Sequence, residues 1–307
     1  MVIRHWMDSP IVTTHGRLRE WQIFKKRQGT APNAETGDVC FDFHCYGRAV
    51  VLPGVTTEPT THDEEVESFF VSYGQGIVQE GKERREFREG SMLFIPAGIE
   101  HRITNTGSGE LEMIYSRRPP SSRDADRMFG VRHWTEDRDQ AIWGTPFQGH
   151  WHHIYRGPSC GDIHIGDIPP HKLSHPHNHP EVMDEIWYVR SGNGWHWMGQ
   201  EYHEHTAGYA LWLDPSELHS LMNPGDATVE YIYCSSGMLL MERMEAEKAA
   251  ESEAKTNDPF ELLARLEKHY KALVAGYRKT GVSIYRVEIN IPGVEAQIEA
   301  LRAALKR

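Results

Sequence analysis

The sequence predicts a mainly β protein in which two similar β-barrels, of the small-barrel or jelly-roll type, stand in tandem and are followed by a helical extension. Three observations support this prediction. Short strand-like runs end at glycine or proline, a set of residues recurs at one constant spacing, and the periodicity becomes helical near the C-terminal end. The chain has 307 residues and 39% apolar content, enough for two domains that each bury a core.

β-Branched and aromatic residues form short runs in both halves of the chain. A glycine or a proline follows each run within a few residues, as expected of a strand that enters a turn. No helical period lies between the runs, so they fit a small barrel or jelly roll. The runs are residues 68–73 and 91–95 in the first half, and 186–190 and 209–213 in the second.

An internal repeat relates the two halves. Five residues of the first half recur 118 positions later, which means that no insertion separates them and that the halves share one fold. The segment Val-Ile-Arg-His-Trp at residues 2–6 also reappears, as Val-Arg-His-Trp at residues 131–134. The five repeated residues are Glu67, Gly74, Gly90, His101 and Asn105, and their counterparts are Glu185, Gly192, Gly208, His219 and Asn223.

The polar segment from Arg117 to Asp126 separates the halves. This places the first barrel at residues 1–120, the second at residues 121–238 and a helical extension at residues 239–307. In the extension, Asp258 and Pro259 read as the start of a helix, and apolar residues follow at helical spacing. We expect this amphipathic extension to pack on its own domain or on a twofold mate, and the protein to form a homodimer or a higher homo-oligomer.

Composition excludes several kinds of partner. The formal charge is −11 and no Lys/Arg-rich block occurs, which argues against nucleic acid and anionic membranes and favours a small-molecule substrate. The N-terminal residues lack the apolar core of a signal peptide, and no run of 18 apolar residues occurs, so we expect a cytoplasmic protein. The four cysteines are scattered and are interpreted as buried thiols.

Histidine is concentrated in one part of the second half, where eight of the 19 histidines lie between His171 and His219. His177 and His179 stand two positions apart, so on an extended segment both imidazoles face the same side. Glu185 adds a carboxylate, and His219 completes the set. Such donors suit a divalent first-row transition metal. We therefore predict a metal site in which Glu185 and His219 are also catalytic.

These motifs together resemble the cupin superfamily, specifically its two-domain members, the bicupins. The family pattern is His-x-His, three or four residues, Glu, six residues, Gly, and later Gly, five residues, Pro-x-Gly, two residues, His, three residues, Asn. Residues 90–105 match the second part without departure, and residues 208–223 match it more loosely. The resemblance implies two β-barrels, each with a metal pocket inside the barrel mouth.

The first part of the pattern is more complete in the second half. Five residues separate His179 from Glu185, where the family has three or four, and a β-bulge would absorb the extra residue. Two alternatives remain open. In the first, His175 and His177 are the histidine pair. In the second, Glu181 replaces Glu185 as the carboxylate ligand.

In the first half, Thr60 stands where the first histidine of the pair would be. The resemblance then leaves His62, Glu67 and His101 as a set of two histidines and one carboxylate. Such a set could form a weaker metal site, a facial triad or an empty structural barrel.

Four residues near the second site are candidates for a substrate pocket. Trp195 and Trp197 share one face of an expected strand and His196 takes the other; the tryptophans are interpreted mainly as core, or else as a flat wall for a planar substrate. Tyr188 and Arg190 fall on alternate positions of the preceding strand, where an arginine facing the pocket would bind a carboxylate.

The leading functional hypothesis is an Fe(II)-type dioxygenase that acts on a small organic substrate, with its metal in the second barrel. Mn, Ni and Zn are alternative metals. The second hypothesis is a non-redox isomerase, lyase or decarboxylase, in which the metal polarises a carbonyl or an enediolate. The third is a ligand-binding cupin without catalytic activity.

Overall fold

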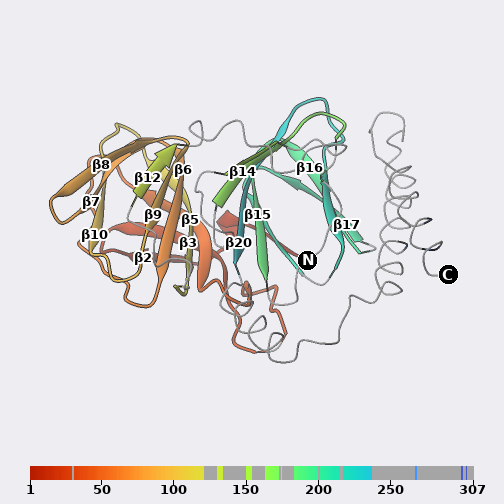
Figure 1. Ribbon diagram of the computed structural model, residues 1–307, viewed down its shortest axis with the longest axis horizontal. Coiled ribbons are helices and arrows are strands. Elements are labelled where there is room, and N and C mark those ends of the chain that lie inside the picture. The colour runs from red at the N-terminus through yellow and green to blue at the C-terminus, as the bar shows by residue number, and fades with distance from the viewer. Residues whose placement is uncertain are drawn as a thin grey trace.

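The structure is a computed structural model that describes residues 1–29, 31–120, 130–133, 150–153, 163–172, 174, 183–199, 201–214 and 217–236, together with Glu267, Glu299 and Arg302. β-Strands dominate these residues and form two barrels that lie side by side, which confirms the predicted fold class (Figure 1). The expected helical extension lies almost entirely outside the described residues. Within the described residues, no helix combines the length and the apolar character needed to cross a membrane.

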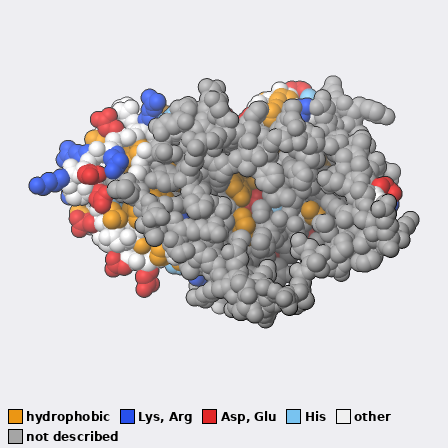
Figure 2. Space-filling model, in the orientation of Figure 1, with side chains coloured by type: hydrophobic (Ala, Val, Ile, Leu, Met, Phe, Trp, Pro, Cys, Tyr) orange, Lys and Arg blue, Asp and Glu red, His pale blue; other side chains and the backbone are white. Residues whose placement is uncertain are grey.

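The first barrel consists of a large and a small antiparallel sheet. The large sheet has the order β12-β9-β6-β11-β5-β3-β2, with β4 added on β3, and the small sheet has the order β10-β7-β8. Acidic and basic side chains lie interspersed on the part of this barrel visible in Figure 2. The strands are β2 (Ile11–Thr14), β3 (Leu18–Lys26), β4 (Asp38–Cys40), β5 (Cys45–Val51), β6 (Val66–Tyr73), β7 (Gln75–Glu80), β8 (Glu83–Arg88), β9 (Ser91–Ile95), β10 (His101–Asn105), β11 (Leu111–Arg118) and β12 (Gly130–His133).

The second barrel repeats this design. Its large sheet has the order β1-β18-β15-β20-β14-β13, and its small sheet has the order β17-β16-β19. A short 3-10 helix, η1 (Trp6–Asp8), follows β1. The strands are β1 (Val2–His5), β13 (His150–His153), β14 (Ile163–Ile168), β15 (Asp184–Ser191), β16 (Asn193–Met198), β17 (Glu201–Thr206), β18 (Tyr209–Leu213), β19 (His219–Met222) and β20 (Val229–Ser236).

The repeated asparagines confirm that the two halves are structurally equivalent. The side-chain amide of Asn105 donates to the carbonyl oxygens of Val51 and Gly109, and that of Asn223 donates to those of Ile168 and Ala227. Each asparagine also accepts a hydrogen bond from the backbone two residues later. Both asparagines are buried, so each satisfies backbone groups at the same corner of its barrel.

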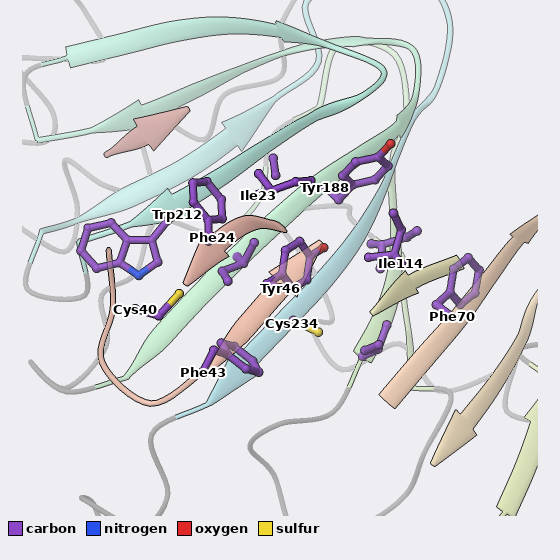
Figure 3. Close-up of a cluster of buried hydrophobic side chains, with 14 of the residues drawn as sticks. Ile23, Phe24, Cys40, Phe43, Tyr46, Phe70, Ile114, Tyr188, Trp212 and Cys234 are labelled. Carbon is purple, nitrogen blue, oxygen red and sulfur yellow. The ribbon is translucent and has the colours of Figure 1, made fainter. Parts of the chain in front are cut away.

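The central strand β6 or β15 of each large sheet is buried on both faces over most of its length. Along β6, Phe69 and Val71 face the interior of the first barrel, whereas Phe70 faces the second barrel. Along β15, Trp187 faces its own barrel and Tyr188 faces the first. The two outward faces meet in one hydrophobic cluster to which both halves contribute (Figure 3). Because the side chains of a strand alternate in direction, residues 67 and 185 point into their own barrels.

Short strands are exchanged between the halves. β1, from the beginning of the chain, pairs antiparallel with β18 of the second barrel, and the N-terminus lies beside that barrel in Figure 1. β12, which follows the first half, pairs with β9 of the first barrel. These are the two copies of the Val-Ile-Arg-His repeat. The structure thus departs from the expected division at residue 120, because each barrel is completed by a strand from outside its predicted range.

A buried carboxylate joins the halves. Asp184, at the start of β15, accepts hydrogen bonds from the backbone N–H groups of Phe41, Asp42 and Phe43 at 2.7 to 3.0 Å, and one from the indole of Trp212 at 2.9 Å. The Asp184 side chain is fully buried. Four donors on one carboxylate therefore anchor a loop of the first half to the central strand of the second.

Candidate metal centre

Three imidazoles converge on one carboxylate inside the first barrel. The carboxylate is that of Glu67, which is buried on β6. His101 Nε2 lies 3.1 Å and His15 Nε2 lies 3.4 Å from Glu67 Oε2, and His62 Nε2 lies 3.5 Å from Glu67 Oε1. The ligand atoms of His15, His62 and Glu67 all lie within 4.8 Å of one another, which is close enough for a shared metal ion.

The other nitrogen of each imidazole is held by a separate group. His15 Nδ1 lies 3.0 Å from the hydroxyl of Thr14, and His101 Nδ1 lies 3.2 Å from the carbonyl oxygen of Ile99. His62 Nδ1 lies 3.3 Å from Glu65 Oε2. Metal-binding histidines usually have their second nitrogen fixed in this way, because it orients the ring and selects the tautomer. All three rings are therefore set with Nε2 towards Glu67.

Each member of this set comes from a different element. Glu67 faces inward by the alternation of β6, and His101 begins β10 after the turn at Pro96–Gly98. His62 lies in the segment between β5 and β6. His15 lies in the turn between β2 and β3 and has a φ of 46°, in the left-handed region that residues other than glycine rarely adopt. Backbone strain of this kind concentrates at functional sites.

His15 was not a candidate in the sequence analysis. The structure brings together His62, Glu67 and His101, which were candidates, and adds a third imidazole that replaces the one missing at Thr60. The cupin-like motif begins downstream of His15, so the motif gives no sign of it. The sequence signal that could have drawn attention to this residue is the pair His15-Gly16 in a turn, where both residues have positive φ.

The Nε2 atoms of His62 and His101 are buried and, within the described residues, form no hydrogen bond of acceptable geometry. Buried polar atoms in proteins are nearly always satisfied, so such atoms call for an ion or another partner. Three neutral imidazoles and one carboxylate suit Fe, Mn, Co, Ni, Cu or Zn. The residues of the first barrel thus fit a divalent transition metal.

The charge of Glu67 is maintained despite its burial. Burial would raise the pKa of Glu67, but the neighbouring imidazoles of His101 and His15 and the charge of Arg117 outweigh this effect and hold the pKa well below its usual value. Burial would likewise lower the pKa of Arg117, yet the charges of Glu67 and Glu20 raise it. The carboxylate is therefore ionised at neutral pH, as a metal ligand must be.

A second carboxylate lies at the more exposed side of the site. Glu65 bridges two histidines, with Oε1 2.7 Å from His44 Nδ1 and Oε2 3.3 Å from His62 Nδ1. These hydrogen bonds lower the pKa of Glu65 to about 2, and the contact with Glu65 raises the pKa of His62. Because Glu65 stays ionised, it orients His62 and is not a proton donor near neutral pH.

The described part of the second site has the same geometry. His219 Nε2 lies 3.1 Å from Glu185 Oε2, and His219 Nδ1 lies 3.0 Å from the carbonyl oxygen of Glu217. Glu217 is the counterpart of Ile99 in the repeat. The structure thus brings Glu185 and His219 together. The predicted ligands His177 and His179, and the alternatives His175 and Glu181, lie outside the described residues.

Further histidines face the interior of the second barrel. The ring of His196 lies 6.1 Å from that of His219 and 6.1 Å from that of His205. His205 Nε2 lies 2.7 Å from the hydroxyl of Tyr231. His196 and His205 are almost completely buried, and burial lowers the pKa of His205 to about 3. The structure thus places His205 in the interior of the barrel.

The four pocket candidates do not line the interior beside Glu185. Tyr188 and Arg190 project from the opposite face of β15, where Tyr188 joins the cluster between the barrels. Arg190 forms ion pairs with Glu89 at 2.7 Å and Glu230 at 3.3 Å. Trp195 and Trp197 pack against each other on the face of β16 opposite His196. Strand alternation explains these positions, because Glu185 and His196 fix which face is internal.

Replacing His15 by asparagine is expected to weaken metal binding by about 100-fold or more, because one of four donors is lost. The change should alter the metal-free stability by no more than about 1 kcal/mol, since asparagine tolerates a positive φ and relief of strain offsets lost packing. Metal titration and thermal unfolding test this. The control is His171→Asn, at the other non-glycine residue with positive φ, 58°, in the part of the chain that the structure describes. Equal affinity in both variants would contradict a ligand role for His15.

The low pKa of His205 predicts acid sensitivity. Its native pKa of about 3 lies below the usual histidine pKa of 6.5, so the unfolded chain binds the proton more readily between these values. The stability present above pH 6.5 is therefore lost as the pH falls towards 3, by about 2 kcal/mol between pH 7 and pH 5. His205→Gln should remove this loss in urea unfolding, whereas His203→Gln, at an exposed position of the same strand, should retain it. Identical pH dependence in the two variants would refute the prediction.

Comparison with known proteins identifies related families and folds. A family model described as a cupin domain matches the chain twice, at residues 47–116 and 164–235. No curated protein matches the sequence. Among solved structures, a putative glyoxylate-induced protein from Pseudomonas aeruginosa has a TM-score of 0.60 and 17% identity, over 72% of this chain and 80% of that one.

Two further structures have the same architecture. A mutant of oxalate decarboxylase from Bacillus subtilis has a TM-score of 0.57 and 14% identity, over 77% of this chain and 78% of that one. AerE from Microcystis aeruginosa has a TM-score of 0.56 and 15% identity, over 73% of this chain and 94% of that one. At these identities the similarity shows the fold, and the fold alone does not determine the function.

Proposed function

Because the chain belongs to the cupin family, with one cupin domain in each half, we propose that the protein is a metal-dependent enzyme that acts on a small organic substrate. One observation carries the proposal. The three imidazoles of the first barrel each have Nδ1 held by another group and Nε2 directed at a buried, ionised glutamate. This arrangement is typical of a metal site supported by a second layer of contacts.

In the first barrel, His15, His62, His101 and Glu67 would hold the metal. In the second, we propose the ligand set expected from sequence, His177, His179, Glu185 and His219. When bound, the metal would supply Lewis-acid or redox chemistry. The protein would orient the substrate and exclude water, since Glu67 and His101 are each 1% exposed. His62, at the more exposed side of the site, would adjoin the entering substrate.

For the reaction class, we propose dioxygenation with Fe(II) as the metal and dioxygen as the second substrate. Neutral imidazoles with one carboxylate are donors that suit Fe(II), and four protein ligands leave coordination positions open. The histidine ligands would be kept in orientation by their contacts with Thr14, Glu65 and the carbonyl oxygen of Ile99.

A non-redox lyase or decarboxylase is the second candidate. The observation that favours it is the similarity in fold to oxalate decarboxylase from Bacillus subtilis, an enzyme whose Mn(II) centres are named in another of its structures. The same ligand set would serve Mn(II), since carboxylate and imidazole donors suit both metals.

Metal analysis after reconstitution with Fe(II) or Mn(II) tests the proposal. Wild-type protein should bind about one ion per complete site, and the pair of changes Glu67→Gln and His101→Gln should remove the ion of the first barrel. The matched pair Glu185→Gln and His219→Gln should remove that of the second. Failure of the wild-type protein to retain any stoichiometric metal would refute a metal-dependent function.

An oxygen electrode separates the two reaction classes. Phenols and keto acids are the first substrates to test with the iron-loaded protein, and dioxygenation predicts oxygen uptake that matches product formation. Turnover of a substrate under strict anaerobiosis would instead establish the non-redox class.

A further inference from the structure

We propose that Arg117 is a positioning residue that leaves Glu67 only one oxygen for a metal. The inference rests on the proposed metal site of the first barrel and concerns how that site is controlled. Arg117 is 5% exposed and lies on β11, which is the neighbour of β6 in the large sheet. Its register partner on β6 is Glu67 itself.

The two oxygens of Glu67 have different surroundings. Oε1 accepts a hydrogen bond from Arg117 Nε at 2.7 Å. Oε2 lies nearest to His101 and His15, at 3.1 and 3.4 Å. A charge-assisted hydrogen bond of this length is stronger than a neutral one, so it competes with metal binding at Oε1. Oε2 is then the oxygen that faces His101 and His15, whereas His62 Nε2 lies 3.5 Å from Oε1.

Arg117 is itself held in place. Its two terminal nitrogens bind the carboxylate of Glu20 on β3 in a bidentate pair, with Nη1 2.9 Å from Glu20 Oε2 and Nη2 in contact with Oε1. Both partners are buried, and the planar fork of an arginine fixes its orientation as well as its distance. Arg117 therefore cannot turn away from Glu67 without breaking two further hydrogen bonds.

The same network selects the tautomer of His15. The hydroxyl of Thr14 donates its single proton to Glu20 Oε1 at 2.5 Å. Towards His15 Nδ1, at 3.0 Å, the Thr14 oxygen can then act only as an acceptor, so Nδ1 carries the proton. Nε2 is then the nitrogen that would present its lone pair to a metal bound beside Glu67. One chain of contacts thus sets both a carboxylate oxygen and an imidazole nitrogen for the metal.

The second barrel reaches the same result with different residues. The repeat counterpart of Arg117 is Ser235, which has no guanidinium, and the counterpart of Phe69 is Trp187. The indole Nε1 of Trp187 donates to Glu185 Oε1 at 2.6 Å, and Glu185 Oε2 faces His219. Arg117 and Trp187 are unrelated donors, yet each binds Oε1 of the glutamate in its own barrel. The feature that the two barrels share is therefore a hydrogen bond to this oxygen, and not an ion pair that the fold requires.

If Glu67 binds the metal through only one oxygen, the metal keeps an open coordination position that the second oxygen would otherwise fill. Loss of Arg117 should therefore allow Glu67 to bind through both oxygens and should block small external ligands. The probe is Co(II), whose visible absorption weakens as its coordination number rises, with azide as the external ligand. All proteins carry Glu185→Gln and His219→Gln, so that only the first site is measured.

Two variants test Arg117. Arg117→Met with Glu20→Gln removes the buried ion pair between these two residues without leaving a charge on residue 20. Arg117→Lys keeps the charge but loses the fork, and it serves if the first variant does not fold. The control is Arg118→Lys, because Arg118 is equally buried and donates to the carbonyl oxygen of Pro119.

In both test variants, Co(II) should still bind, its visible absorption should weaken, and azide affinity should fall by about 10-fold or more, the usual range for changes in groups that support ligands. The control should keep the parent spectrum and azide affinity. Unchanged spectra and azide affinities in the test variants would overturn the role of Arg117. Failure of the parent protein to bind Co(II) would instead overturn the proposed metal site.

Discussion

Replacing Asp184 by asparagine is expected to lower the free energy of unfolding by about 3 kcal/mol or more. The carboxylate accepts four hydrogen bonds from donors that are fixed in the backbone and in Trp212. Asparagine presents one acceptor oxygen and an NH2 group that would face N–H donors, so buried donors lose their partners. The cost is large because the group is fully buried and connects the two halves.

Urea unfolding followed by circular dichroism measures this effect. Asp226→Asn is the matched control, because the Asp226 side chain is 90% exposed and contacts only the partly exposed His171 among the contacts described. The control should change the stability by no more than about 0.5 kcal/mol. If the two variants were equally stable, Asp184 would not be the anchor between the barrels.

Deleting residues 1–5 is expected to destabilise the second barrel more than the first. The deletion removes β1, whose four residues pair with β18, and leaves the edge of that sheet without its partner. Amide hydrogen exchange in residues 209–213 should become about 10-fold faster or more, because exchange follows local opening.

The repeat supplies an internal control for this deletion. β9, at residues 91–95, is the counterpart of β18 and receives its edge strand from β12, which the deletion leaves intact. Amides of β9 should keep their protection. Equal acceleration in β9 and β18, or in neither strand, would contradict the strand exchange.

The fold was largely predictable because local sequence patterns specify it. Strand runs, their terminating glycines and the constant offset of 118 positions predicted two equivalent barrels, and the structure places Asn105 and Asn223 in equivalent contacts. The exchanged strands were not predictable. The repeat at residues 2–6 and 131–134 showed that the two copies are alike, but periodicity gives no information about which distant strand each one joins.

The candidate site was predictable where a motif specified it. Glu67 and His101 follow from the motif, whereas His15 comes from a turn that the motif does not include. Tyr188 and Arg190 were misplaced for a different reason. Residues 184–189 of β15 are buried on both faces, so hydrophobicity does not reveal the internal face. The position of Glu185 reveals the internal face, because residues an odd number of positions away project to the other side of the strand.

The central claim is that His15, His62, His101 and Glu67 bind one metal ion in the first barrel. Anomalous diffraction from crystals soaked in Co(II) tests it most directly. We predict a peak at about 2.0 to 2.3 Å from Nε2 of each histidine and from one oxygen of Glu67. The claim would be contradicted by a crystal in which Co(II) binds elsewhere, while the residues around Glu67 are unchanged and no peak lies among them.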